Sequence, residues 1–485
     1  MVWRCQRSTG GVTRALLQRF GLIGLMSLPG MLGVQKLHLL EKQFSVPLVP
    51  GNHGLIEHLE KALSFQLSDN EIPVRLVIAG VDDGKYLCEV GCLVGNDLRS
   101  RSIDQSIFSY RQRRGTASGS FNTVFIVPTG VGAEVGGHAG DATPAAQLLA
   151  SCCDQLITHP NVVNASDINE LPSNVQYVEG SVLCRLLMGT VGLESVKANR
   201  LAVVFDIQPD EMIENLVLNT VEAARTTYGL DCSGLFRLNP PLELTATTSK
   251  SGRAIGEGRH LDSLFALLEE KADEIDALAI SSLINVPQGM HDQYFRSDGA
   301  MINPWGGIEA MLTHAVSHCF DIPSAHAPMM ESRAILNEDP GTVDPRMAAE
   351  AISSSFLTCV LKGLKQSPRI VSDEQNMTAS GVLTAQDVSC MVIPEGCIGL
   401  PTLAALEQGI TVIAVREGSG LIAQELAALP WREKQFYVAE NYWEAAGILS
   451  ALRAGIAPAS VRRPMSRLAV ETWPARTSTR AENAV

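Results

Sequence analysis

The sequence contains few aromatic residues, no CxxC cysteine framework and no excess of positive charge. Aromatic residues make up 5% of its 485 positions, and its 11 cysteines are scattered and odd in number. A secreted disulfide scaffold needs an even set of cysteines, so this pattern favours free thiols in a reducing compartment. Lys and Arg number 38 against 52 Asp and Glu, a net charge of −14. We therefore expect no nucleic-acid partner, because phosphate backbones are bound by clustered basic side chains.

The sequence also lacks an uninterrupted apolar run long enough to cross a bilayer. The run at residues 20–34 is 15 residues long and is broken by Pro29 and four glycines, whereas a membrane-spanning helix needs about 20 apolar residues. Hydrophobic residues nevertheless reach 46% of the chain and charged residues 19%. This composition is typical of a soluble globular protein, and we expect no membrane partner.

Acidic residues are missing from the first 40 positions. Four arginines, at positions 4, 7, 14 and 19, are spread there among Ser, Thr, Gly and apolar residues. Such a composition is typical of organelle transit peptides. A secretory signal is the alternative, but Pro29, the glycines and the cysteine pattern disfavour it. We expect residues 1–35 to form a targeting leader.

Short apolar runs alternate with helix-like segments through most of the chain. The expected strands are residues 123–127, 156–158, 201–206, 277–284, 388–393 and 411–415. The expected helices are residues 142–153, 211–228, 261–272, 348–364 and 400–408. Strands that alternate with helices predict an α/β fold of parallel, doubly wound sheets with helices on both faces.

The length predicts several domains, because one domain usually holds roughly 100 to 200 residues. We expect two α/β lobes, at residues 119–280 and 281–463. A smaller α/β domain with a linker is expected at residues 36–118, where a strand pair surrounds the Asp82-Asp83-Gly84 turn. The polar tail at residues 464–485 is expected to be disordered. No internal repeat places the boundary between the lobes.

A ligand-binding site is predicted at the glycine-rich loop that follows residues 123–127. Ligands bind α/β units where strands end, and glycine lets backbone amides approach an anion at a helix start. The spacing departs from the dinucleotide pattern G-x-G-x-x-G, so a nicotinamide cofactor is disfavoured and no cofactor is identified. Tight turns needed only for packing are the alternative. The loop glycines that we predict to bind a ligand are Gly130, Gly132, Gly136 and Gly137.

Polar side chains accompany this loop at the expected strand ends. His138 with Asp141 is a candidate general base with its orienting residue, and His159 is a candidate second acid/base group or metal ligand. Each of them singly also suits a hydrogen-bonded structural role. The further candidates for ligand binding are Asn161, Asn164 and Asp167.

A second candidate loop has the sequence NPWGGIE. Trp305 suits stacking on a planar ligand, and the two glycines after it suit a helix start that faces an anion. His314 and His318 have zinc-binding spacing, but they lack the glutamate of H-E-x-x-H, so no metal site is predicted. The candidate ligand-binding residues here are Asn303, Trp305, Gly306, Gly307, Glu309 and His326.

A third loop, PEGCIGLP, lies between an expected strand and an expected helix. Its arrangement is similar to the nucleotide-sugar end of glycosyltransferases and epimerases, where an acidic residue near a glycine turn binds the ribose. Cys397 lies at a helix start, but an inert thiol is the favoured interpretation. The candidate binding residues are Glu395, Gly396 and Gly399.

Five sequence blocks together resemble an uncharacterised family of cyanobacterial and plastid proteins, known only as a domain of unknown function. The blocks are PTGVGAEVGGHAGDATP, LITHPNVVNASDINELP, YVEGSVLCRLLMGTVGL, NPWGGIEAM and AHAPMMES. The resemblance covers roughly residues 121–458. It implies a plastid (chloroplast) location if the chain is eukaryotic, with the cytoplasm expected otherwise. It brings no activity, substrate or catalytic residue.

Two functional hypotheses follow. In the first, the protein is an enzyme that binds a small anionic metabolite, such as a phosphorylated or carboxylated sugar or nucleotide, between α/β lobes. In the second, the same cleft binds a metabolite without catalysis. A nucleotide-sugar transferase or epimerase is a further alternative. An acid/base pair within hydrogen-bond reach in the cleft favours catalysis. The metal content and the formation of a homo-oligomer are left open.

Overall fold

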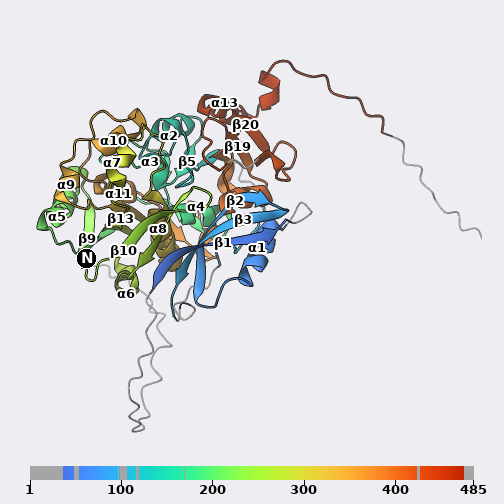
Figure 1. The fold of residues 1–485 in the computed structure, drawn as a ribbon. Helices are drawn as coiled ribbons and strands as arrows, with labels where there is room; N and C mark the ends of the chain where they lie inside the picture. Colours follow the sequence, from blue (N-terminus) through green and yellow to red (C-terminus); the bar gives the residue numbers. More distant parts are fainter. Residues whose placement is uncertain are drawn as a thin grey trace, which may run out of the picture. The chain divides into compact units, whose positions relative to one another are not determined.

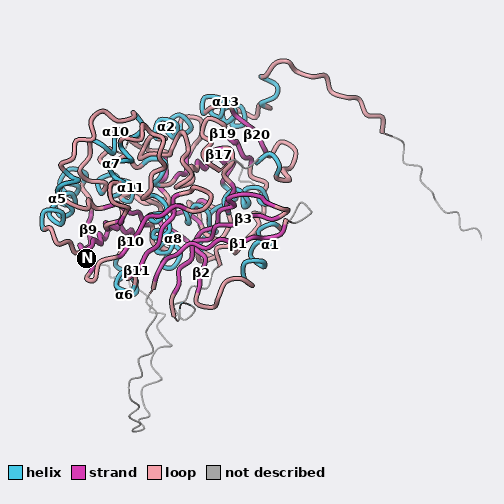
Figure 2. Tube along the Cα trace, viewed as in Figure 1, coloured by secondary structure: helices cyan, strands magenta, loops and turns pink. Residues whose placement is uncertain are grey.

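The fold is described from a computed structural model that covers residues 37–48, 54–96, 98, 106–115, 119–168, 170–422 and 426–473. The expected leader at residues 1–35 and residues 474–485 of the expected tail lie outside the described residues. Residues 464–473 contain no helix or strand. Figure 2 shows helices and strands alternating along most of the remaining chain.

The first parallel sheet has the strand order β20-β19-β17-β4-β5-β6. Every neighbouring pair in it is parallel, with Val124 opposite Ile157 in one direction and Met391 in the other. Its central strands are buried because helices cover both faces. The strands are β4 (Asn122–Phe125), β5 (Gln155–Thr158), β6 (Val175–Tyr177), β17 (Val388–Pro394), β19 (Thr411–Val415) and β20 (Phe436–Ala439).

A second parallel sheet has the order β14-β12-β8-β9. Its strands are β8 (Arg200–Asp206), β9 (Asp231–Leu238), β12 (Ala277–Ser282) and β14 (Ser324–Pro328). The predicted α/β class with parallel sheets is therefore confirmed. Strands of the first sheet come from residues 122–177 and 388–439, on both sides of the predicted lobe boundary. The domain boundaries themselves stay predictions.

A mixed sheet has the order β13-β10-β11-β1-β3-β2-β18, so strands from residues 38–94 pair with strands from far along the chain (Figure 1). Its β2 and β3 meet at the expected turn, where Asp83 and Gly84 have φ of 43° and 69°. The strands are β1 (His38–Pro47), β2 (Glu71–Asp82), β3 (Lys85–Val94), β10 (Glu243–Thr248), β11 (Ala254–Arg259), β13 (Ile284–Asn285) and β18 (Ile398–Gly399).

The 18-residue helix α5 shows how the sequence defines a helix. It begins where the Asp210 side chain accepts a hydrogen bond from the backbone of Met212, and it ends at Gly229, whose φ of 61° is left-handed. The helices of eight or more residues are α1 (Leu55–Ser64), α2 (Thr143–Ala150), α4 (Gly180–Leu187), α5 (Glu211–Tyr228), α6 (Asp262–Lys271), α8 (Gly306–Phe320), α11 (Leu357–Leu364), α12 (Leu400–Gln408) and α13 (Tyr442–Arg453).

The single helix expected at residues 348–364 is wrong, because the structure divides it into α10 (Ala348–Ala351) and α11. Three consecutive serines lie between the two. Ser353 Oγ donates to Asp167 Oδ2 at 2.6 Å and to the carbonyl of Ser355 at 2.9 Å. Serine side chains that bond nearby backbone in this way compete with helix formation. The other short helices are α3 (Pro160–Val163), α7 (Met290–Phe295) and α9 (Arg333–Leu336).

The remaining elements are small. A three-stranded antiparallel sheet has the order β15-β7-β16. Its strands are β7 (Gly192–Glu194), β15 (Arg369–Val371) and β16 (Val382–Leu383). The 3₁₀ helices are η2 (Ala272–Glu274), η3 (Pro345–Met347), η4 (Asn376–Thr378), η5 (Ala385–Asp387), η6 (Leu426–Ala428) and η7 (Pro458–Val461).

A buried ionic cluster joins the strands of the mixed sheet. Arg253 is 0% exposed and donates to the carboxylates of Glu41 on β1 and Glu89 on β3, the latter at 2.9 Å. Ser251 Oγ donates to the second oxygen of Glu89 at 2.8 Å. Burial raises the pKa of Glu41 to about 7. The cluster therefore depends on the arginine, because without it two carboxyl groups would be buried side by side.

Candidate functional site

A polar cavity lies beyond the ends of β4 and β5 and beside β14, and we call it the polar chamber. It encloses about 760 Å³, part of which is open to solvent. The loop that follows β4 and the start of α8 both reach it. The predicted site residues that line it are Gly130, Gly137, His159, Asn161, Asn164, Asn303, Gly306, Glu309 and His326.

Two further cavities share lining residues with the polar chamber. The aromatic chamber, about 850 Å³, is lined in part by Trp305, Phe295 and Phe356, and shares Glu309 and His326 with the polar chamber. The apolar chamber, about 1030 Å³, has a mainly aliphatic lining. Thus Trp305 and Gly399 each line one of these two cavities rather than the polar chamber.

Several predicted site residues lie outside the linings of these cavities. A Cβ on Gly136 would lie 2.6 Å from Val127 Cγ1, one on Gly132 2.9 Å from Ile302 Cγ1, and one on Gly307 2.3 Å from the Ala254 carbonyl oxygen. Close packing therefore accounts for these glycines. Asp167 accepts a hydrogen bond from Ser353. Glu395, next to Gly396, forms an ion pair with Arg416 at 3.2 Å.

His138 has a different partner from the one expected. Its Nδ1 lies 2.7 Å from Tyr294 Oη, and Tyr294 in turn donates to Glu350 at 3.2 Å. Asp141 instead accepts from the backbone amides of Gly136 and His138. Burial lowers the pKa of His138 and raises that of Asp141 to about 7. The imidazole is thus oriented by a tyrosine and does not line the polar chamber.

His159 follows β5 and lines both the polar and the apolar chambers. Its Nε2 accepts a hydrogen bond from the backbone amide of Val127 at 3.2 Å, which places the proton of the neutral ring on Nδ1. Burial lowers its pKa to about 4. His159 is therefore a neutral hydrogen-bond donor at neutral pH.

An acid/base pair that the sequence did not predict lies beside His159. Glu179 Oε1 is 2.5 Å from Nδ1 of His314, which reaches the cavity from α8. Burial disfavours the Glu179 carboxylate, but attraction to His314 and its hydrogen bonds outweigh this effect and lower its pKa. His314 Nε2 is left to face the cavity that the ring lines. A carboxylate-oriented histidine of this kind is suited to general acid/base catalysis.

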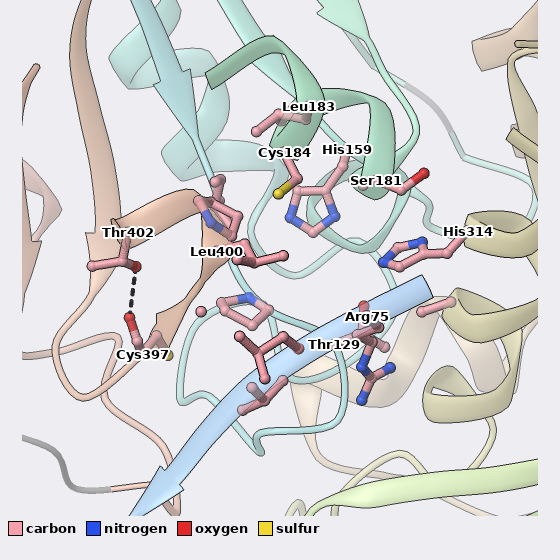
Figure 3. A pocket seen from close by; sticks show the side chains of 18 of the residues that line it. Arg75, Thr129, His159, Ser181, Leu183, Cys184, His314, Cys397, Leu400 and Thr402 are labelled. Atoms are coloured by element: carbon pink, nitrogen blue, oxygen red, sulfur yellow. Dashed lines mark hydrogen bonds between the residues drawn. The ribbon is translucent and has the colours of Figure 1, made fainter. Parts of the chain in front are cut away.

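Glu179 is held in place by the start of α4. Its Oε2 accepts from the backbone amide of Ser181 at 2.8 Å, from that of Val182 at 3.2 Å and from the Ser181 hydroxyl. Its Oε1 also accepts from Thr313 Oγ1 at 3.2 Å. The sequence signal was an acidic residue before a helix start in YVEGS. Figure 3 shows His159 and His314 directed into the same cavity.

A second histidine–carboxylate pair lies on another wall of the polar chamber. His326 Nδ1 is 2.9 Å from Glu309 Oε1, and its Nε2 is 2.8 Å from Ser282 Oγ. Ser282 is 0% exposed and cannot contact a ligand directly. The Glu309 side chain is 24% exposed, against 1% for His326. Ser282 and His326 therefore position the carboxylate of Glu309 at the cavity.

No group of three or more His, Cys, Asp or Glu residues within the described part of the chain is arranged to hold a metal ion. His314 uses Nδ1 for Glu179, so its spacing to His318 does not form a zinc site. Cys397 is buried, and burial raises its thiol pKa to about 12. The cysteines in the described ranges form no disulfide. None of the helices in the described ranges is both long and apolar enough to span a bilayer.

We expect His159 to reduce the stability of the protein in acid. Its pKa is about 4 in the folded protein and about 6.5 in the unfolded chain. Between these values only the unfolded chain binds the proton, so the free energy of unfolding falls as the pH is lowered, by about 3 kcal/mol in all. Urea unfolding of wild type and H159Q at neutral pH and near pH 4.5 measures this difference. Equal pH dependence in the two proteins would contradict the assignment.

Gly180 leaves room for the His314 ring. A Cβ at Gly180 would lie 2.9 Å from His314 Cε1, so G180A is expected to displace the ring and to cost about 1 to 3 kcal/mol. The control is G447A in the exposed part of α13, where an added Cβ would meet no atom within 4 Å. That change should stabilise the protein by about 0.5 to 1 kcal/mol. Thermal unfolding should therefore show shifts of opposite sign, and shifts of the same sign would refute this role of Gly180.

Comparison with known proteins connects this site to a family. An uncharacterised lipoprotein of the cyanobacterium Synechococcus sp. is 34% identical to the chain over 347 residues, which cover 70% of this chain and 93% of the relative. No solved structure matches the chain. The model of the family described as "Protein of unknown function (DUF3326)" matches residues 122–462. The cyanobacterial family expected from the sequence blocks is thereby confirmed, and the chain belongs to the DUF3326 family.

Proposed function

We propose that the protein is an enzyme that transfers a proton on a small anionic metabolite, at a carbon next to a carbonyl or carboxyl group. The observation that carries the proposal is the 2.5 Å contact between Glu179 and His314 in the cavity wall. His314 Nε2 takes the proton, and the electron pair of the broken C–H bond moves to the substrate oxygen. Glu179 stabilises the imidazolium that forms.

His159 supplies the second part of this chemistry. Its neutral ring carries a proton on Nδ1, which can donate to the substrate oxygen as negative charge develops there. A pKa of about 4 keeps the ring neutral at physiological pH, so it acts as a donor and does not compete with His314 as a base. Proton return from His314 Nε2 to a carbon of the substrate completes the cycle.

The hydroxyl groups beside the pair favour acid/base over nucleophilic catalysis. Ser181 and Thr313 both donate to Glu179 rather than to His314. A serine nucleophile would instead need its hydroxyl at the histidine nitrogen that acts as its base. Ser282 has such a hydrogen bond with His326, but it is fully buried.

The anionic part of the metabolite is expected to bind backbone amides. The lining of the polar chamber, within the described residues, includes no Lys or Arg. It includes Gly130 and Gly137 of the loop and the start of the 15-residue helix α8, where the Gly306 amide itself donates to Asn303 Oδ1 at 3.3 Å. The aligned peptide dipoles of such a helix favour negative charge at its N-terminus.

Proton exchange with solvent tests this proposal, because it can be followed on a substrate whose product is unidentified. A panel of carboxylated and phosphorylated carbonyl metabolites is incubated with the protein in D₂O, and loss of C–H signals is followed by proton NMR. Wild type should exchange a proton of at least one compound, and H314A should slow that exchange by about 10²- to 10⁴-fold. H58A, which removes a partly exposed histidine on α1, is the matched control and should leave the rate unchanged.

Two results would refute the proposal that the protein is an enzyme. One is exchange that proceeds equally in H314A. The other is a metabolite that raises the melting temperature of wild type but loses no proton, which would favour the non-catalytic binding protein instead.

We further propose that, in a eukaryotic cell, the chain is directed to the plastid. Its support is the acid-free, arginine-bearing sequence of residues 1–40 together with a cyanobacterial relative. A fluorescent fusion of the full chain should localise to plastids, and a fusion that lacks residues 1–35 should not.

A further inference from the structure

The apolar chamber adjoins the proton-transfer pair. It shares Thr129, His159, Gly180, Ala310 and His314 with the polar chamber, so the two cavities meet at the imidazoles. Figure 3 shows Leu183, Cys184 and Leu400 around the part of the cavity that His159 enters. The aliphatic and thiol side chains that line it include Val77, Ile107, Leu183, Cys184, Ile398 and Leu400.

Polar groups that line this chamber are engaged with the protein. Thr402 Oγ1 donates to the carbonyl of Cys397 at 2.9 Å, and Arg185 forms an ion pair with Asp321 at 2.7 Å. Arg75 donates to the carbonyl of Gly307 at 3.2 Å, and its guanidinium points away from His159 and His314 (Figure 3). The chamber therefore offers a ligand mainly hydrocarbon surface.

The apolar lining of the chamber exceeds what the proposed chemistry alone requires. Its volume of about 1030 Å³ includes space open to solvent, but its walls are mainly aliphatic. A proton-transfer site for a small sugar or nucleotide gains nothing from an apolar cavity beside it. Water is held poorly there, because it needs two or more polar partners.

We propose that the substrate is an amphipathic carboxylic acid, whose polar end binds at His314 and His159 and whose hydrocarbon arm occupies the apolar chamber. The inference rests on the proposed function, because it assigns the substrate class to the same site. The polar chamber holds the carboxylate and the reacting carbon. The arm passes Thr129 and Gly180, the residues common to both cavities, and ends between β2 and α4.

Binding of straight-chain acids from butanoate to dodecanoate, measured by calorimetry on the full-length protein, tests the inference. Each added methylene buried in the chamber should tighten binding by up to about fourfold. C184F places a large ring in the chamber from α4, and V77F does so from the opposite wall on β2. Both substitutions should lower the affinity for the long acids to the affinity measured for the short acids. C184A, which leaves the chamber open, should retain the chain-length dependence.

Affinity that does not change with chain length in wild type would overturn the inference. So would a chain-length dependence that persists in correctly folded C184F and V77F, because the acids would then bind elsewhere. Circular dichroism identifies a variant that fails to fold, and the inference is then tested with the other variant. The exchange assay and the binding assay distinguish the two proposals. Absence of exchange together with chain-length-dependent binding refutes the proton transfer. Exchange together with binding that does not depend on chain length refutes only the hydrocarbon arm.

Discussion

E179A is expected to lower the free energy of unfolding by about 3 to 5 kcal/mol at neutral pH. Glu179 is 3% exposed and accepts hydrogen bonds from Ser181, Val182, Thr313 and His314. Its removal leaves the partly buried His314 ring without its hydrogen-bond partner and several other donors without an acceptor, and each unsatisfied group costs free energy. Urea unfolding followed by circular dichroism measures the loss.

The matched control is E222A, which removes a glutamate that is 55% exposed and pairs with Arg225 on α5. Its cost should be below about 1 kcal/mol, as for other surface pairs. The pH dependence is a further test. The pKa of Glu179 lies below its ordinary value of 4.5, so its stabilisation is present above that pH and is lost as the pH falls through the folded value. A deficit no larger than that of E222A would show that the carboxylate does not support the site.

R253M is expected to destabilise the protein by about 3 to 5 kcal/mol. Arg253 is 0% exposed and joins Glu41 and Glu89 across the strands β1 and β3. Methionine fills much of the same volume but leaves Glu89 buried without its cation, while Glu41 keeps only Arg75, whose Nη2 lies 3.9 Å from Glu41 Oε2. Urea unfolding at neutral pH measures the change.

R259M on β11 is the control, because Arg259 is 68% exposed and its ion pair with Glu257 is long, at 3.9 Å. It should cost less than about 1 kcal/mol. The deficit of R253M should also depend on pH. Unpaired buried carboxyls bind protons more tightly in the folded chain than in the unfolded chain, so the deficit grows as the pH rises above about 4.5. A deficit that is the same at all pH values would contradict this account.

Local pattern predicted many elements of this fold, but not the strands β9, β10 and β11. The strand expected at residues 411–415 is β19, and the helix expected at residues 211–228 is α5, with Asp210 and Gly229 at its ends. A strand that is buried on both faces is recognised by a continuous apolar run in the sequence. A capped amphipathic helix is recognised by apolar residues that recur with the period of the helix. The helix expected at residues 348–364 failed because serine hydrogen bonds override periodicity.

The candidate site was predicted in part. His159, Glu309 and His326 were all predicted as site residues, and they line one chamber. They do not share one sheet edge, because His159 follows β5 of the first parallel sheet, His326 lies in β14 of the second, and Glu309 lies in α8. The expected pairing of His138 with Asp141 relied on nearness in sequence. In the structure the His138 ring instead forms a hydrogen bond with Tyr294 Oη. His314 was considered only as a zinc ligand, because nothing local connects it with a glutamate 135 residues away.

The sequence by itself determined the α/β class, the glycine loop and the strand ends at which polar side chains gather. These features arise from periodicity and from backbone preference, which act over a few residues. Only the tertiary structure decided that Glu179 meets His314, and that strands of residues 38–94 share a sheet with strands of residues 243–285 and 398–399. Such contacts depend on how α4 packs against α8 and on which distant strands pair in one sheet. The local residue pattern does not determine these long-range contacts.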